Sequence, residues 1–375
     1  MPELSGLVFF DGRPAEDSRF YGSVKSSWPF TESDSTEVFE LFSDFSWNDS
    51  LYMRFGKQTI NWGVGYFFSP ANIMNLQQID PTDPTAQLEG PVALRAMYAI
   101  PKTQHNLWAY AVFDAEAMAA GGLKPEDTAL AAKAEFVLGG VELGVGGYYQ
   151  RESPIRAMLT AVGSVRDVSL FGEATAQLGT DRTWVTKVDD ALTIVNNFVT
   201  TTDTDDYDST VFLKGTVGFN YMNTDKNITL MGQYLYDGEG YANDDREARI
   251  AEAKADEVAI KAALALVPTV DDVDAAFSLF LKSLILNSGR HYAAFTFAKS
   301  EWLVDNLNFS AFVIANLSDF SGYLKPTLSW EFFDGFSLAA SAMFALGFED
   351  GEYVVLNDGQ ALGLSLALTM GTGSF

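Results

Sequence analysis

The feature that most constrains this sequence is a segment of about ten residues, alternating apolar with polar or small side chains, that recurs along the chain. Residues 37–47 are predicted to place Phe39, Leu41, Phe45 and Trp47 on one face and Glu40, Asp44 and Ser46 on the other. The same alternation recurs at residues 168–178, 307–317 and 361–370. Because successive side chains of a strand point to opposite faces, each segment predicts a strand with one oily and one polar face.

The connections between these segments alternate strictly between short and long. We expect strands near residues 19–28, 37–47, 51–60, 90–100, 105–114, 129–138, 141–151, 156–165, 168–178, 210–222, 228–237, 290–300, 307–317, 321–333, 336–346 and 360–371. Short turns fall at residues 48–50, 101–104, 139–140, 166–167, 224–227, 304–306 and 334–335. The long loops are 61–89, 115–128, 179–209, 238–289 and 347–359. Turns on one side and loops on the other are typical of bacterial transmembrane barrels.

We therefore predict an all-β fold: a transmembrane antiparallel up-and-down β-barrel of about 16 strands, as a single outer-membrane domain over residues 1–375. The pattern leaves fourteen and eighteen strands open. Residues 1–18, which include LSGLVFFDG, lie outside the count and are read as a seventeenth strand or as a periplasmic or plugging segment.

Composition agrees with strands, rather than helices, crossing a membrane. We find no run of about 18 apolar residues, although 47% of the chain is hydrophobic. Aromatic residues make up 14%, which suits the girdles of a barrel and equally the core of a large soluble β-protein. The chain has no cysteine, and its net charge of −26 argues against a nucleic-acid partner. No secretory leader precedes Pro2 and Glu3, so we interpret Met1 as a start added to a mature sequence.

One long loop carries a strong helical signal. Residues 243–287 predict a helical hairpin whose first helix is capped by Asn243 or Asp244 and ends at Pro268. The second helix is expected to start among the acidic residues 271–274 and to run to about Asn287. This extracellular loop is interpreted either as a lid or receptor surface, or as an ordered loop without a ligand.

Catalytic and metal-binding motifs are not apparent. The chain has 2 histidines, and neither lies in a recognisable motif. His291 with Ser288 is the one pair that suggests an outer-membrane hydrolase. The acidic run at residues 203–209 resembles a calcium loop but lacks its glycine and terminal glutamate, so a solvated loop is favoured. We predict no enzyme activity, no cofactor and no metal.

The polar faces of the strands are the candidate functional surface. An Arg or Lys facing lipid at mid-membrane costs roughly 2 to 4 kcal/mol, so charges that alternate with apolar residues should face the lumen. By this parity the pore-lining residues are Glu40, Asp44, Arg54, Arg95, Lys133, Glu135, Glu142, Glu173, Lys214, Lys325 and Glu331. A wall of mixed charge requires water, which favours an aqueous pore over a plugged barrel held together by a charge network.

One stretch is similar to a known family. The segment MRFGKQTINWGVGYFFSPANIMN, followed by DPTDP and GPVALRAMY, resembles alginate-export-like outer-membrane channels and related substrate-specific porins. The matching residues are Arg54, Gly56, Gln58, Asn61, Trp62, Gly63, Pro70, Leu94 and Arg95. The resemblance implies that loop 61–89 folds inward as a constriction, with Arg54, Gln58 and Arg95 beside it. Acidic residues balance or outnumber basic ones, unlike an arginine-lined alginate pore, so the resemblance does not extend to an alginate-like substrate.

The sequence thus predicts a bacterial outer-membrane porin for passive diffusion of small hydrophilic solutes. The alternative is a structural or adhesive surface barrel that binds a partner through its long extracellular loops. Expected partners are outer-membrane lipid and lipopolysaccharide, the barrel insertion machinery through the C-terminal strand ending at Phe375, and a second copy in a homo-oligomer.

Overall fold

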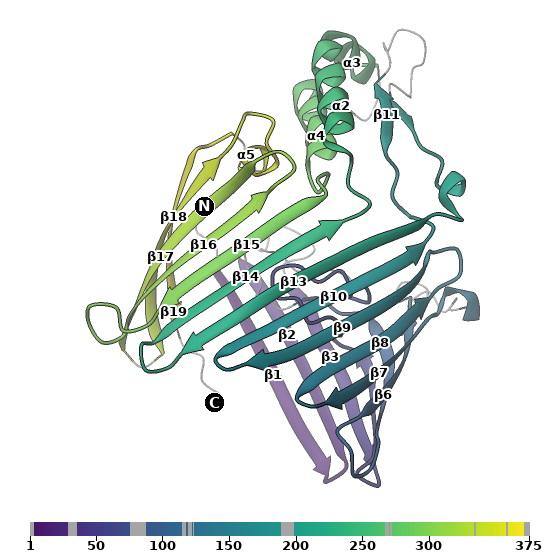
Figure 1. Cartoon of the computed structure of the whole chain (residues 1–375), viewed down its shortest axis with the longest axis vertical. Coiled ribbons are helices and arrows are strands. Elements are labelled where there is room, and N and C mark those ends of the chain that lie inside the picture. Colours follow the sequence, from purple (N-terminus) through teal and green to yellow (C-terminus); the bar gives the residue numbers. More distant parts are fainter. Residues whose placement is uncertain are drawn as a thin grey trace. The chain divides into compact units, whose positions relative to one another are not determined.

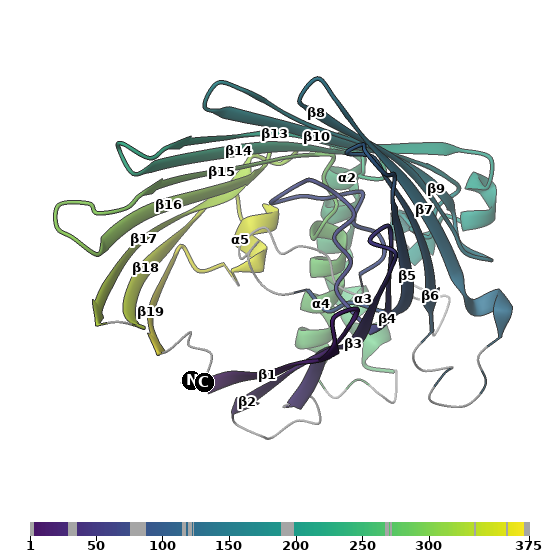
Figure 2. The ribbon, with the colours of Figure 1, turned by 90° about the horizontal axis from the view of Figure 1, so that it is seen from below.

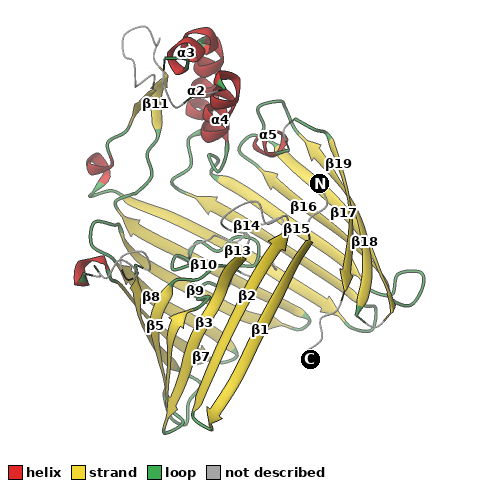
Figure 3. Ribbon diagram, turned by 180° about the vertical axis from the view of Figure 1, so that it is seen from behind, coloured by secondary structure: helices red, strands yellow, loops and turns green. Residues whose placement is uncertain are grey.

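The computed structural model describes the chain in two compact units. The described residues are 4–28, 36–75, 88–114, 118, 122, 124–188, 199–266, 270, 272–333, 335–357 and 359–370. Unit 1 comprises residues 1–164 with 171–179, and unit 2 comprises residues 165–170 with 180–375. Long antiparallel strands dominate both units (Figures 1 and 3).

Unit 1 is an up-and-down run of antiparallel strands, each hydrogen-bonded to the next along the chain. The strands are β1 (Leu4–Ala15), β2 (Ser18–Trp28), β3 (Thr36–Trp47), β4 (Leu51–Lys57), β5 (Val92–Ala99), β6 (Asn106–Phe113), β7 (Ala129–Leu138), β8 (Val141–Tyr149), β9 (Ile155–Val165) and β10 (Val168–Leu178), the last of which lies mostly in this unit.

Unit 2 repeats the same antiparallel pattern. Its strands are β13 (Val211–Asn223), β14 (Ile228–Asp237), β15 (His291–Lys299), β16 (Leu307–Asn316), β17 (Ser321–Phe333), β18 (Phe336–Leu346) and β19 (Leu362–Met370). A separate small hairpin is formed by β11 (Val185–Val188) and β12 (Val199–Thr201). The helices are α2 (Asn243–Ala255), α3 (Glu257–Leu264), α4 (Val273–Ile285) and α5 (Glu352–Leu356).

Each of the sixteen predicted strands is present, and the largest difference is at 51–60, where β4 ends at Lys57. The N-terminal stretch that did not fit the count is β1, so the described residues form 17 long strands rather than 16. The hairpin β11–β12 and the short helix α5, both in long loops, are not apparent from the sequence pattern.

The tight turns explain why neighbouring strands follow so closely. Asn48 and Asp49 have φ of 52° and 49°, and Gly139 and Gly140 have φ of 58° and 86°. Positive φ at both central residues matches the type I′ turn, whose twist suits a two-residue hairpin.

The two faces of the sheet in unit 1 differ as the alternation predicts. The large apolar side chains exposed on one face include Leu41, Phe45, Phe55, Leu94, Leu130 and Leu159. One assignment in β3 is wrong: Phe39 is buried, whereas Val38 is 41% exposed. The register with β2 shifts between Ser23 and Val24, so a bulge at Phe39 turns its ring to the polar face.

The loop is helical as predicted, but the first expected helix is divided into α2 and α3, and the caps also differ. Ala242 is the N-cap residue of α2 and makes no side-chain capping bond, so the expected cap at Asn243 or Asp244 is wrong. Asp272 caps α4 by accepting a hydrogen bond from the Ala275 N–H. Pro268 and Asp271 lie outside the described residues. Among the residues described, no helix is both long and apolar enough to cross a membrane.

Leu159, near the middle of β9, tests which face meets lipid, because it is 59% exposed. We expect Leu159→Arg to lower the free energy of unfolding in phospholipid vesicles by about 2–4 kcal/mol. Glu142→Arg, at an exposed position on the opposite face of β8, is the matched control and should change it by less than about 1 kcal/mol. Urea titrations followed by tryptophan fluorescence measure both; equal costs would contradict the assignment of faces.

Candidate functional site

One row of the sheet in unit 1 gathers arginines on the polar face. The residues that are successive cross-strand partners from β2 to β9 are Arg19, Asp44, Arg54, Arg95, Tyr110, Ala131, Tyr148 and Arg156, here called the arginine row. In a barrel, strands tilt by roughly 35–45° from the axis, so a row perpendicular to the strands also climbs along the axis. Such a row presents its charges at successive depths.

The acidic member of the row joins two of its arginines. Arg54 donates two hydrogen bonds to the Asp44 carboxylate, at 2.6 and 2.9 Å. Arg19 lies 3.7 Å from the same carboxylate and donates two bonds of 3.0 Å to Asp11 on β1. Bidentate arginine–carboxylate pairs fix both partners in orientation, so this end of the row is a preorganised network.

Aromatic rings support the guanidinium groups. The Arg54 guanidinium carbon lies 3.6 Å from the centre of the Phe42 ring, and that of Arg95 lies 5.6 Å from Trp108. Arg156 lies 5.7 Å from the ring of Tyr148. A cation over an aromatic face is attracted by the ring electrons, which stabilises the position of the guanidinium group.

Arg95 differs from Arg54 and Arg19. Its direct cross-strand partner on β4 is the like-charged Arg54, an arrangement that is destabilising in itself. Within the described part of the chain, no acidic side chain forms an ion pair with Arg95. Its five N–H donors therefore make Arg95 the best-placed group in the row to bind an anionic or polar solute.

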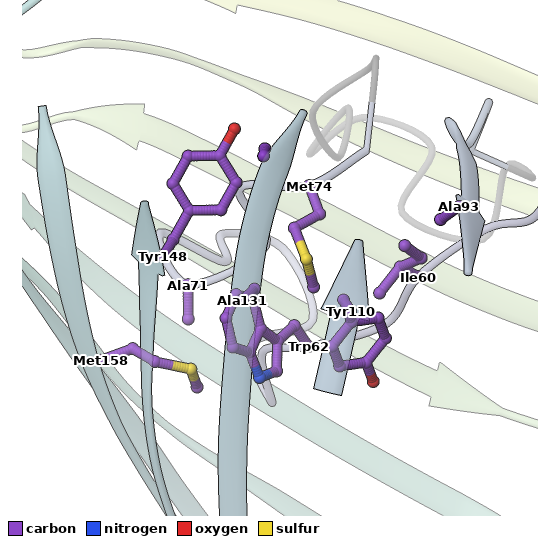
Figure 4. Packing of buried hydrophobic residues seen from close by; sticks show 10 residues of the cluster. Ile60, Trp62, Ala71, Met74, Ala93, Tyr110, Ala131, Tyr148 and Met158 are labelled. Carbon is purple, nitrogen blue, oxygen red and sulfur yellow. The ribbon is translucent and has the colours of Figure 1, made fainter. Parts of the chain in front are cut away.

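A segment after β4 packs on this same face. Residues 58–75 bury Ile60, Trp62 and Met74 against Tyr110 of β6 and Tyr148 of β8 (Figure 4). Figure 2 shows the strands of unit 1 curving around this segment. The described part of loop 61–89 thus lies on the polar face, while residues 76–87 are outside the described residues.

Two charged side chains from the wall hold the segment. The buried Glu173 of β10 accepts hydrogen bonds from the Val64, Gly65 and Ala71 N–H groups, at 2.6, 3.2 and 3.1 Å. Lys133 of β7, 7% exposed, donates to the Trp62 carbonyl at 3.0 Å. Lys133 also pairs with Glu135 at 2.9 Å, so its charge is compensated.

Two further residues fix where the segment leaves β4. Gln58 is fully buried and its amide donates to the Ala93 carbonyl at 2.9 Å. Glu40 accepts a hydrogen bond of 3.2 Å from the Thr59 N–H. These contacts bind the segment to β5 and β3 at its first turn.

The residues predicted to line a pore therefore separate into groups. The arginine row contains Asp44, Arg54 and Arg95, whereas Glu40, Gln58, Lys133, Glu135 and Glu173 contact the segment 58–75 or its supports. Glu142 of β8 is exposed on the same face. Five residues of this face were not among those predicted from the sequence: Arg19, Trp108, Tyr110, Tyr148 and Arg156. Strand parity could have placed them on this face, but their alignment follows from the pairing register.

In unit 2, Lys214 lies near the start of β13 in a charged cluster. Its ammonium is 3.1 Å from Asp237 and 2.8 Å from Glu239. Burial favours the neutral form of Glu239, but Lys214 and the hydroxyl of Thr180 outweigh it and hold the pKa of Glu239 below its usual value. Further along the polar face, β17 carries Lys325 opposite Phe312, and Glu331 is exposed at its far end.

Two long loops of unit 2 and the short connection between β16 and β17 meet at one buried carboxylate. Glu352 of α5 accepts hydrogen bonds from the Asn287 N–H at 2.7 Å, the Asn316 amide at 2.7 Å and the Tyr292 hydroxyl at 3.0 Å. Its own N–H donates to Asp319, which pairs with the buried Arg246 of α2 at 2.9 Å. Helices α2, α3 and α4, here called the helical cap, are thereby tied to the ends of β15 and β16.

Ser288 and His291, the pair that suggested a hydrolase, are each hydrogen-bonded to other groups. The Ser288 hydroxyl donates to the Ile285 carbonyl and accepts a bond from Arg246, while His291 Nδ1 is 2.6 Å from the Tyr234 hydroxyl. His105 accepts a hydrogen bond from the Val137 N–H.

No group of three or more metal-ligating side chains occurs among the described residues. In the run 203–209, Asp203 caps a short 3-10 helix.

Comparison with known proteins identifies the fold. No protein-family model matches the sequence, and no curated protein matches it. The Escherichia coli outer-membrane protein Wzi, described as a carbohydrate-binding β-barrel involved in group 1 capsule assembly, superposes with a TM-score of 0.53 at 10% identity over 98% of this chain and 78% of Wzi. OccD3 of Pseudomonas aeruginosa gives 0.52 at 9% identity over 98% and 86%. OccK10 of the same organism gives 0.50 at 8% identity over 100% and 96%. The chain has the up-and-down β-barrel fold of Gram-negative outer-membrane porins, as predicted.

Glu352 makes the stability of unit 2 depend on pH. Burial raises the pKa of its carboxyl above the ordinary value of 4.5, so the folded protein holds this proton more tightly than the unfolded chain. Between the pKa of Glu352 in the unfolded chain and its higher pKa in the folded protein, unfolding releases a proton. In that range the free energy of unfolding falls as pH rises, by at most about 1.4 kcal/mol per pH unit.

The expected result is that Glu352→Gln removes this slope above pH 4.5. Hydrogen exchange of the amides in α5 and in the helical cap, measured over a pH series and corrected for intrinsic rates, reports it. Glu247→Gln, at an exposed position of α2, is the control and should leave the slope unchanged. A Glu352→Gln variant with the wild-type slope would show that another group is responsible.

Proposed function

We propose that this protein is a porin of the bacterial outer membrane that lets small hydrophilic solutes diffuse passively. The observation that carries the proposal is the arginine row, a line of charged side chains on the face opposite to the exposed apolar one. Charged side chains on the inner wall of a barrel need water around them. An aqueous passage supplies that water to the charged members of the row.

The chemistry of the row favours solutes that can accept hydrogen bonds. Arg95 offers donors without an acidic partner among the described residues, and Trp108 and Phe42 supply flat apolar surfaces beside the guanidinium groups. The net charge of the chain is −26, so this local excess of arginines stands against an acidic background. We infer that the row provides the solute contacts and that the inward segment 58–75 narrows the passage beside them.

The proposed setting follows from the fold. We place the short turns in the periplasm and the long loops, including the helical cap, outside the cell, where they meet lipopolysaccharide. The apolar face then contacts lipid. An interaction with the insertion machinery through Phe375, which lies outside the described residues, stays a prediction from the sequence. A homo-oligomer stays a prediction from the sequence.

Removing the Arg95 charge should change ion selectivity. At roughly 7 Å in water one unit charge alters the free energy of a monovalent ion by about 0.6 kcal/mol, which is roughly threefold in local concentration. We expect planar-bilayer recordings to show stepwise conductance for the wild type and a shift of reversal potential toward cation selectivity, up to that size, for Arg95→Gln. Arg151→Gln, at an exposed position in the connection after β8, is the control. A wild type without conductance would overturn the proposal.

A second function is favoured by the helical cap. Its core of Ile250, Ile260, Phe277 and Ile285 is buried, and the loop containing α5 packs against it. A preformed surface of this kind binds a partner without the entropic cost of ordering a flexible loop. Because Wzi is described as carbohydrate-binding, a bacterial surface polysaccharide is the partner class to test first.

Deleting the helical cap distinguishes the two functions. The Tyr241 N–H and the Ser288 carbonyl are hydrogen-bonded at 2.8 Å, so a two-glycine turn can replace residues 242–287. If the cap is an adhesive surface, this variant should lose binding of purified surface polysaccharide in a micelle pull-down while keeping its bilayer conductance. Equal binding by the wild type and the deletion variant, or none by either, would count against the second function.

A further inference from the structure

The buried Glu173 occupies an anion-binding site made of backbone. One of its carboxylate oxygens accepts the Val64 and Gly65 N–H groups, and the other accepts the Ala71 N–H. Successive N–H groups that converge on one point form a concave site for an anion. Here the anion is a side chain of β10, which is 109 residues away from Val64 in the chain.

The segment is shaped to admit this carboxylate. A Cβ atom at Gly63 would collide with the Ser69 hydroxyl and with Glu173 Oε2, so any larger residue would displace one of these groups from its present position. Glu173 is 5% exposed, which excludes most water from its hydrogen bonds. Hydrogen bonds to a charged acceptor in such surroundings are stronger than neutral ones.

Other hydrogen bonds from the wall hold the segment at residues 58, 59 and 62. The Trp62 indole lies over Gly146 of β8, where a Cβ atom would come within 3.0 Å of the ring. This flat apolar contact has no directional bond, since the Trp62 indole N–H is buried without a partner. Lys133 binds the segment at the Trp62 carbonyl only. Within residues 64–71, Glu173 is the acceptor for three backbone N–H groups, those of Val64, Gly65 and Ala71.

We propose that Glu173 is the positioning residue that holds the segment 58–75 against the wall and so keeps the passage open. This inference rests on the proposed porin function and on the segment lying in the passage. Without the carboxylate, three N–H groups of the segment, one of them that of the buried Ala71, lose their acceptor, and the segment gains by moving to where water can satisfy them. A detached segment then enters the solute path and interrupts the current.

The test uses chemical rescue in single-channel recordings. Glu173→Ala should shorten the open lifetime roughly tenfold or more, because hydrogen bonds to a charged group are lost. The substitution also leaves a hole that fits the carboxylate of acetate or formate. Adding acetate in place of chloride at constant ionic strength should restore the open lifetime of Glu173→Ala and leave the wild type unchanged.

Two variants separate positioning from general damage to the fold. Glu173→Gln fills the hole and directs an amide N–H₂ at the backbone donors, so it should be impaired and should not respond to acetate. Glu126→Ala, which removes an exposed carboxylate elsewhere in unit 1, should behave as wild type with and without acetate. A Glu173→Ala channel with wild-type open lifetimes, or one that acetate does not restore, would overturn the proposal.

A second readout does not depend on conduction. Acetate that binds only the folded Glu173→Ala protein should raise its urea midpoint in micelles as the acetate concentration rises, with no such effect on Glu173→Gln. If neither the wild type nor any variant conducts, the porin function fails. The acetate-dependent shift of the midpoint then still decides whether Glu173 fills an anion site in the segment.

Discussion

The polarity of each strand position depends on one constraint, the two-residue period of antiparallel strands whose register is fixed by backbone hydrogen bonds. Once Asp44 is paired with Arg54, and Arg54 with Arg95, these charges can move to the other face only if the strand slips or a bulge forms in it. A slip would also carry Leu94 and its apolar neighbours inward. The lipid-facing surface and the arginine row are therefore two consequences of the same register.

The charges of the polar face serve two different purposes. The guanidinium groups of Arg54 and Arg95 lie beside aromatic rings of the wall. Glu173 and Lys133 instead form hydrogen bonds with backbone groups of the segment 58–75. A loop folded against a wall brings carbonyl and N–H groups that no strand satisfies, and leaving them unpaired costs about 1–3 kcal/mol each. Buried wall charges that match these groups are what allow such a loop to stay folded.

Much of the fold could be predicted from the sequence because the decisive pattern is local. Strand positions follow from alternation, and the turns at Asn48–Asp49 and Gly139–Gly140 have residues that accept positive φ. Phe39 was misassigned because a bulge depends on the pairing with β2, which a single strand does not reveal. Polarity placed Glu173 and Arg95 on one face, but only the contacts of Glu173 with a segment over a hundred residues away distinguish it from Arg95.

The acidic composition of the chain does not decide which charges a solute meets in the proposed passage, because many of them are paired. Asp44 and Glu135 pair with Arg54 and Lys133, so their charge is compensated within the wall. The Glu173 carboxylate is bound by backbone N–H groups, whose dipoles compensate part of its charge. What a solute meets is set by the charge left without a partner, and in the described part of the arginine row that charge belongs to Arg95. Net charge thus governs the surroundings of the protein, while local pairing governs its interior.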